Sequence, residues 1–336
     1  MRATIKDIAR ELGIGFSTVS RALNHSYGVH PDTISLVEKK AAELGYIPNL
    51  GAKQLVGKKS GLIGIFMPEF EVEATPEHHE FFPPINKALR ELGKDAVIFP
   101  VPHNRYRPGS LKEWVQQRNL EGGVFMPPFW KGHPLMKEAL ELKLPSVTLS
   151  DARSPQCSQV RSDDREGGRL AGQLLMEYGH RIIGYIDGPP GLCLCQERLE
   201  GFREAMANGA EPSSMKLLTA QGDFSGTSGA EAVLRLLRSC PEMTAVCCCN
   251  DLMAMGAITA LAKEGLRVPE DVSVMGYDGA FFTAYMNPPL TTVCHNNARI
   301  GARAVELLAN LLSGGPSQGE RIAPSLAVRD SVRRLT

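Results

Sequence analysis

A regular alternation of short apolar segments with helix-patterned segments, from about residue 62 onward, constrains this chain most strongly. Each apolar segment ends in turn residues. Such alternation is typical of parallel sheets built from right-handed βαβ units. The apolar segments are Leu62–Pro68, Ala96–Val101, Gly123–Met126, Pro145–Ser150, Arg181–Asp187, Ala245–Asn250 and Val272–Tyr277, and the helical segments between and after them are Ile85–Leu92, Gly167–Tyr178, Glu197–Ala207, Gly229–Leu237, Leu252–Glu264 and Ile300–Leu312.

These predicted strands are too many for a single sheet of this type, so we expect an α/β core of two Rossmann-like lobes over residues 61–336. Ligands of such folds bind at the carboxyl ends of the strands, in the crevice between the lobes. A chain of 336 residues has room for this core and for one small additional module.

The first 46 residues contain no strand pattern and predict three short helices. Thr4 with Asp7 resembles a capping box for a helix over Ile5–Leu12, and a Gly-containing turn separates it from a second helix over Phe16–Leu23. The third helix covers Pro31–Leu44. Two helices joined by so short a turn are typical of a helix-turn-helix, although a generic αα-hairpin has the same pattern.

Charge and residue types at this end of the chain are compatible with DNA binding. Residues 1–59 hold nine basic and five acidic residues in a chain of net charge zero, which is the footprint of a phosphate-binding module or of a solvated charged face. The second helix begins with Phe16, Ser17 and Thr18 and continues to Ser20 and Arg21. Hydroxyls and a guanidinium suit phosphates and base edges, and arginine can pair bidentately with guanine.

Other classes of protein are disfavoured. The N-terminus is charged where a secretory signal is apolar, and no apolar run reaches membrane-spanning length, so we expect a cytoplasmic protein. Neither Cys193–Cys195 nor the run Cys247–Cys249, which is typical of apolar filler in a buried strand, has the spacing of a zinc knuckle, so no metal site is expected. Phosphate-loop and nucleophile-elbow motifs are absent, so we predict neither catalytic residues nor a cofactor.

Three motifs resemble the lactose-repressor/galactose-repressor family of bacterial transcription factors. They are Thr4-Ile5-Lys6-Asp7-Ile8-Ala9, Ser17-Thr18-Val19-Ser20-Arg21-Ala22-Leu23-Asn24, and Ala42-Glu43-Leu44-Gly45-Tyr46-Ile47-Pro48-Asn49 with Ala52-Lys53-Gln54-Leu55 after it. Similarity continues in Arg198-Leu199-Glu200-Gly201-Phe202, Asn250–Gly256, Val274–Asp278 and Leu290–Val293. The resemblance implies a helix-turn-helix domain over residues 1–47, a hinge helix and linker over 48–60, and a core of the periplasmic-binding-protein type I fold.

In this family the second helix enters the major groove, and the hinge helix folds in the minor groove with a leucine as wedge. Gly15 replaces the usual serine cap, and His30 stands where a serine begins the third helix. A hinge segment of about eight residues is too short to be helical alone. The DNA-binding residues predicted in this way are Thr4, Phe16, Ser17, Thr18, Ser20, Arg21, Asn24, His30, Thr33, Asn49, Ala52, Lys53 and Leu55.

The resemblance also implies a small-molecule effector between the lobes. Asp151, Arg198, Asn250 and Asp278 carry over as its polar ligands, and their carboxylate, guanidinium and amide groups suit a sugar or sugar phosphate. Phe82, Trp130 and Phe224 are candidates for stacking, although packing is as plausible for each ring. Met126–Trp130 and Phe81–Pro84 depart from the family by bringing rigid apolar bulk towards the cleft.

We therefore expect a homodimeric repressor that binds a pseudo-palindromic operator and releases it when a sugar binds. A phosphoprotein or a purine-like corepressor remains an alternative trigger, since some relatives bind DNA more tightly with their partner bound. A sugar receptor without DNA function is a remoter alternative, because it predicts a signal sequence and no basic N-terminal arm. An enzyme is not expected.

Overall fold

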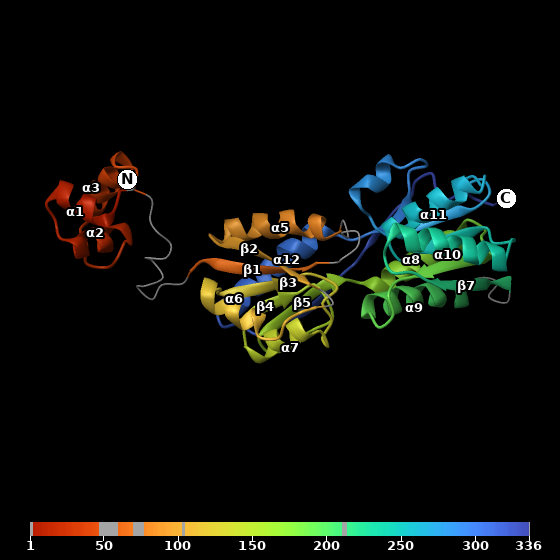
Figure 1. Cartoon of the computed structure of the whole chain (residues 1–336), viewed down its shortest axis with the longest axis horizontal. Coiled ribbons are helices and arrows are strands. Elements are labelled where there is room, and N and C mark those ends of the chain that lie inside the picture. Colours follow the sequence, from red (N-terminus) through yellow and green to blue (C-terminus); the bar gives the residue numbers. More distant parts are fainter. Residues whose placement is uncertain (1–2, 47–59, 70–76, 103–104, 210–213, 336) are drawn as a thin grey trace. The chain divides into compact units, whose positions relative to one another are not determined.

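The computed structural model describes residues 3–46, 60–69, 77–102, 105–209 and 214–335 (Figure 1). The chain divides into two compact units, Met1–Ser60 and Gly61–Thr336. Four residues predicted to act in the hinge, Asn49, Ala52, Lys53 and Leu55, lie outside the described residues. In the part that is described, no helix is both long enough and apolar enough to span a bilayer.

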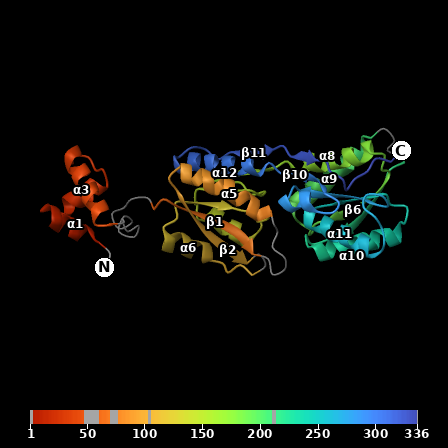
Figure 2. The ribbon, with the colours of Figure 1, turned by 90° about the horizontal axis from the view of Figure 1, so that it is seen from above.

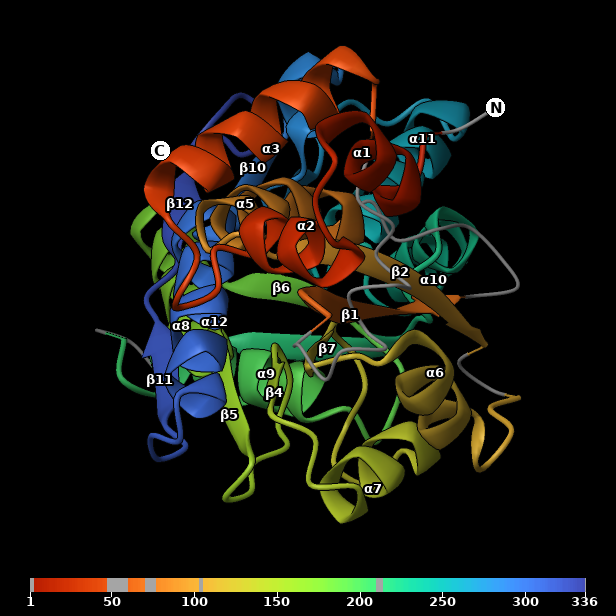
Figure 3. The same ribbon diagram turned by 90° about the vertical axis from the view of Figure 1, so that its left-hand side faces the viewer.

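The N-terminal unit is the predicted bundle of three helices, α1 (Ile5–Leu12), α2 (Phe16–Leu23) and α3 (Pro31–Glu43) (Figure 3). The capping box at Thr4 is confirmed: its backbone N–H donates to the carboxylate of Asp7 at 2.9 Å, and its hydroxyl accepts from the Asp7 N–H at 3.4 Å. The unit's small core consists of Ile8, Val19, Ala22, Val37 and Ala41.

The first lobe of the core is a parallel sheet in the order β11-β5-β4-β3-β1-β2. Its strands are β1 (Leu62–Glu69), β2 (Asp95–Pro102), β3 (Gly122–Phe125), β4 (Ser146–Thr148), β5 (Cys157–Ser162) and β11 (Gly319–Ile322). One face is covered by α5 (Glu77–Glu91) and α12 (Asn297–Leu312), and the opposite face by α6 (Ser110–Arg118) and α7 (Pro134–Glu141), as Figure 2 shows in part.

The second lobe is a sheet in the order β12-β10-β9-β8-β6-β7, in which only β12 runs antiparallel to its neighbour. Its strands are β6 (Ile182–Asp187), β7 (Lys216–Gln221), β8 (Ala245–Cys248), β9 (Ser273–Asp278), β10 (Thr291–Cys294) and β12 (Ser325–Ala327). Helices α8 (Asp164–Glu177) and α9 (Cys193–Ala207) lie opposite α10 (Gly226–Ser239) and α11 (Asp251–Lys263) across the sheet (Figure 2). The two predicted α/β lobes are thus confirmed.

The chain passes between the lobes three times. It leaves the first lobe after β5, returns between β10 and α12, and leaves it again between β11 and β12. The C-terminal quarter of the chain therefore completes both sheets. The residues at these crossings connect the two lobes directly.

Candidate functional site

A cavity of about 650 Å³, partly open to solvent, lies where the two lobes meet. Residues from both lobes line it: Phe81, Pro127, Pro128, Leu149, Arg161, Ser162, Asp164, Leu194, Arg198, Phe224, Asn250, His295 and Ile300. About half of these side chains are apolar. Of the polar ones, Arg161, Ser162, Asp164 and His295 lie at the crossings between the lobes, and Arg198 and Asn250 belong to the second lobe. This is the arrangement of a small-molecule site in a two-lobed α/β fold.

Arg198, on α9, is the most densely bonded polar side chain of the cavity. Its Nε donates to Asp164 at 2.9 Å, and its Nη1 donates to the carbonyl of Cys249 at 2.6 Å and to Asp278 at 3.3 Å. The guanidinium carbon lies 3.7 Å from the centroid of the Tyr277 ring. Burial opposes the charge, but Asp164, Tyr277 and Asp278 together raise the pKa of Arg198 well above its usual value. The cation is therefore held in a fixed orientation.

The other two predicted ligands of the second lobe are Asn250 and Asp278. Asn250 follows β8, and Asp278 is the last residue of β9. The Asn250 amide is used within the lobe: its oxygen accepts from the Met253 N–H at 2.9 Å and caps α11, and its nitrogen donates to the Phe224 carbonyl at 3.0 Å. Asn250 lines the cavity, as does Phe224 at a left-handed φ of 73°. Asp278 is buried behind Arg198 and does not line the cavity itself.

Asp151 and Trp130 line a second space of about 320 Å³, which shares several lining residues with the first. The Asp151 carboxylate accepts from the Lys131 N–H at 3.0 Å. The Trp130 ring stands edge-on to His133, with centroids 5.1 Å apart. Phe82 lines neither space, because it packs against the core of the first lobe while its neighbour Phe81 faces the cavity.

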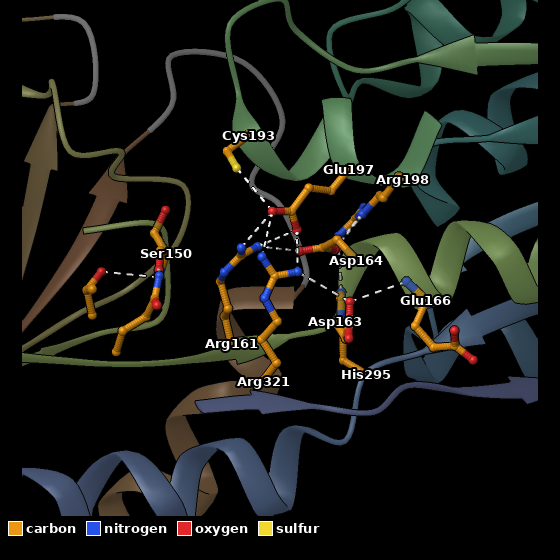
Figure 4. Close-up of polar contacts among 12 residues, drawn as sticks. Ser150, Arg161, Asp163, Asp164, Glu166, Cys193, Glu197, Arg198, His295 and Arg321 are labelled. Atoms are coloured by element: carbon orange, nitrogen blue, oxygen red, sulfur yellow. Dashed lines mark hydrogen bonds and ion pairs between the residues drawn. The ribbon is translucent and has the colours of Figure 1, made fainter. Parts of the chain in front are cut away.

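A network of ion pairs that was not predicted from the sequence lies beside the cavity (Figure 4). The two Nη atoms of Arg161, at the end of β5, each donate a hydrogen bond of 2.7 Å to the carboxylate of Glu197 on α9. Arg321 of β11 donates to the same carboxylate at 2.9 and 3.2 Å and to Asp163 at 3.4 Å. Burial acts to raise the pKa of Glu197, but the two arginines hold it below its usual value. Two cations of the first lobe thus hold one carboxylate of the second.

Two buried polar atoms at the same crossing have no hydrogen-bond partner within the described part of the chain. They are the Ser162 hydroxyl and the Nε of Arg161. Both residues line the cavity. A buried donor without a partner is costly, so these atoms are suited to bind polar groups of a ligand.

In the N-terminal unit, the predicted DNA-binding residues lie largely at the surface. Thr4, Phe16, Ser17, Arg21 and His30 are exposed, whereas Thr18, Ser20, Asn24 and Thr33 are half-buried. Several have local bonds as well. Arg21 donates to the Tyr27 carbonyl at 2.8 Å, Asn24 donates to the Ser20 carbonyl at 2.7 Å, and His30 caps α3. Gly15 leaves the start of α2 without a side-chain cap.

Both units match models of known protein families. Residues 4–49 match the model described as bacterial regulatory proteins, lacI family, and residues 173–332 match a periplasmic binding protein-like domain.

Similarity to individual proteins spans nearly the full chain. The chain is 33% identical to the probable HTH-type transcriptional repressor ExuR of Bacillus subtilis (strain 168), over 99% of each chain. The lac repressor dimer bound to operator and the anti-inducer ONPF is 28% identical, with a TM-score of 0.84 over 99% of this chain and all of that one. The complex of the transcriptional regulator CelR with cellobiose is 30% identical, with a TM-score of 0.72 over 98% of this chain and all of that one.

Proposed function

Because the chain belongs to the lacI family of bacterial regulatory proteins, we propose that it binds a pseudo-palindromic operator as a homodimer and releases it when a sugar binds between its lobes. It is a DNA-binding transcriptional repressor with an effector-binding core, and not an enzyme. The observation that carries the effector half of the proposal is the cavity at the lobe crossings, which is lined both by residues with unpartnered polar atoms and by apolar rings.

The exposed start of α2 supports the DNA half. Phe16, 54% exposed, and the hydroxyl of Ser17 can reach base edges, with Arg21 one turn further along the helix. Thr4 and His30 lie at the starts of α1 and α3, where helix N-termini favour phosphate. We place the hinge at residues 48–60 on the family resemblance, with Leu55 as the minor-groove wedge. The lac repressor dimer seen on its operator supports a two-fold assembly.

An uncharged sugar suits the cavity better than a sugar phosphate. Arg161 is paired with Glu197, and Arg198 is paired with Asp164 and Asp278, so neither cation has charge to spare for a phosphate. The Ser162 hydroxyl and the Nε of Arg161 can bond sugar hydroxyls, while Phe81 and the two prolines form an apolar wall for the ring. The cellobiose complex of CelR supports this class of effector.

A ligand between the lobes would act on their relative position. It would contact Ser162 at one crossing and Arg198 in the second lobe, next to the ion pairs that join Arg161 and Arg321 to Glu197. Closing the lobes would then separate the two hinges of the dimer and melt the hinge helices. In such systems operator and effector affinities are coupled by about 1–3 kcal/mol, and the coupling is reciprocal.

Footprinting of the pure full-length protein, with and without a panel of neutral sugars, tests this proposal. The expected result is a protected two-fold sequence that loses protection with one sugar, and the same sugar should raise the thermal unfolding midpoint. Tighter protection with a ligand would overturn release in favour of corepression. If no two-fold sequence is protected under any condition, the operator proposal fails.

A further inference from the structure

Two cysteines and an aspartate converge in the second lobe, close beside the effector cavity. They are Asp187, Cys195 and Cys249, and one possible ligand atom from each lies within 4.8 Å of the other two. Both thiols are almost completely buried, and the carboxylate is half-buried. Nothing in the proposed sugar and operator binding uses these three side chains.

The fold accounts for this convergence. β6 and β8 are adjacent and parallel, with Ile186 opposite Cys248, and the Cys249 N–H donates to the Ile186 carbonyl at 2.8 Å. The next residues, Asp187 and Cys249, therefore reach the same edge of the sheet. The first turn of α9 then brings Cys195 over that edge.

Gly188 permits the close approach of the chain to this cluster. A Cβ at this position would lie 2.6 Å from the sulfur of Cys195 and 2.5 Å from the Phe224 ring, so any side chain would displace the thiol or the ring. The backbone N–H of Gly188 donates to Asp187 at 2.9 Å, which helps to fix that carboxylate. The three candidate ligands are thus held by strand register, a helix start and a glycine.

We propose that Asp187, Cys195 and Cys249 bind one thiophilic metal ion of the Zn²⁺ class. Two thiolates and a carboxylate are a ligand set that Zn²⁺ accepts, and its tetrahedral preference leaves one position for a small exogenous ligand such as water. The spacing within Cys193–Cys195 or within Cys247–Cys249 gives no sign of this site, because each run contributes one ligand.

An arginine beside the cluster can offset the charge that metal binding would leave. On binding, each thiol releases its proton to solvent, so two thiolates and the Asp187 carboxylate face one divalent cation and the site retains a single negative charge. The Arg198 guanidinium, which donates to the Cys249 carbonyl at 2.6 Å, lies near enough to offset that charge.

The site is next to the effector cavity in sequence and in space. Leu194 and Asn250, which line the cavity, directly adjoin Cys195 and Cys249. A bound ion would tie the start of α9 to the end of β8. The proposal does not depend on the identity of the effector or on operator binding.

Cadmium titration of the reduced full-length protein, in a thiol-free reductant, tests the site. The expected result is one tight Cd²⁺ per chain, with a thiolate-to-metal charge-transfer band and release of two protons per ion. Zn²⁺ should compete for the same site and raise the thermal unfolding midpoint. Cys195→Ser and Cys249→Ser should each abolish the band, and Asp187→Asn should weaken binding more than ~10-fold.

Cys157→Ser is the matched control, because Cys157 is an equally buried thiol in the first lobe. This variant should keep the band and the affinity of the unchanged protein. A band that persists in the Cys195→Ser/Cys249→Ser double variant would overturn the proposal, and so would a wild-type chain that binds Cd²⁺ no more tightly than that variant. Proton release from the unchanged protein checks the site even if a variant fails to fold.

Discussion

In the N-terminal unit, Arg21 is exposed and donates to a backbone carbonyl, whereas in the core Arg161 and Arg198 are buried against carboxylates. An exposed cation keeps its charge available to a partner outside the chain. A buried cation forms its ion pairs within the fold and orients the groups around it. We therefore propose that the two units use arginine for different properties, affinity for DNA in one and the shape of a ligand site in the other.

Loss of the buried cation should have the largest effect. Arg198→Ala leaves Asp164 and Asp278 buried without their shared partner, so we expect the free energy of unfolding of the core to fall by about 3–5 kcal/mol. Effector binding should be lost as well. Denaturant unfolding and calorimetry with the effector measure these two losses.

Arg203→Ala is the matched control for this change, since Arg203 is exposed on the same helix. It should alter stability by less than about 0.5 kcal/mol. Operator affinity, measured where the Arg198→Ala core is still folded, should stay near that of the unchanged protein. If Arg198→Ala weakened operator binding as strongly as effector binding, the two units would not be functionally separate.

The apolar strands of the core were the easiest part to predict from sequence. The run at Ala245–Asn250 contains the observed β8, and Val272–Tyr277 overlaps β9 in all but its last residue, because a strand buried on both faces is apolar throughout. β5, β7, β10 and β11 were not predicted as strands. β5 and β7 mix polar and apolar residues, and β10 and β11 have only four residues each.

The site was predictable only where family resemblance supplied it. Arg198 and Asn250 were predicted from matching motifs, and both line the cavity. Arg161 and Asp164 could not be predicted, since an arginine and an aspartate in a charged stretch resemble a solvated surface. Only the crossing from β5 to α8 buries them, and that crossing is a property of the topology rather than of any local pattern.

The second prediction concerns pH and the buried His180 of the core. Its ring nitrogens lie 2.9 Å from the Thr244 hydroxyl and 3.1 Å from the Arg333 carbonyl. Burial lowers the pKa of His180 to about 4, below the value of about 6.5 expected in the unfolded chain. The unfolded chain therefore takes up the proton first, so this contribution to stability is complete above about pH 6.5 and is lost as the pH falls towards 4.

Between pH 7 and pH 5 we expect this residue to remove about 2 kcal/mol from the free energy of unfolding. His180→Gln should remove that dependence, whatever its effect at pH 7. Unfolding curves of both proteins across this pH range measure the difference, and equal slopes would show that His180 is protonated in the fold.

The third prediction tests the exposed cation. Arg21→Ala should weaken operator binding at least about tenfold, or ~1.4 kcal/mol, because a guanidinium contact to a base or phosphate is lost. Effector binding and core stability should not change. Arg21→Lys keeps the charge but not the bidentate geometry, so it should retain the salt dependence while losing base preference. Fluorescence titration of operator variants at two salt concentrations separates these effects, and equal affinity of all three proteins would exclude Arg21 from the interface.

The smallest expected effect lies at the turn between α1 and α2, where two glycines differ in backbone conformation. Gly15 precedes α2 at a φ of −65°, and a Cβ there would meet no atom closer than 3.8 Å. Gly15→Ser should therefore stabilise α2 by about 0.5–1 kcal/mol, because it adds a cap and restricts the unfolded chain. Gly13 has a φ of 64°, so Gly13→Ser should destabilise the unit by about 1 kcal/mol. Native-state hydrogen exchange of α2 amides in the full chain should show opposite signs for the two variants, with core amides unaffected; a change in core protection would mean that the units are energetically coupled in the absence of DNA.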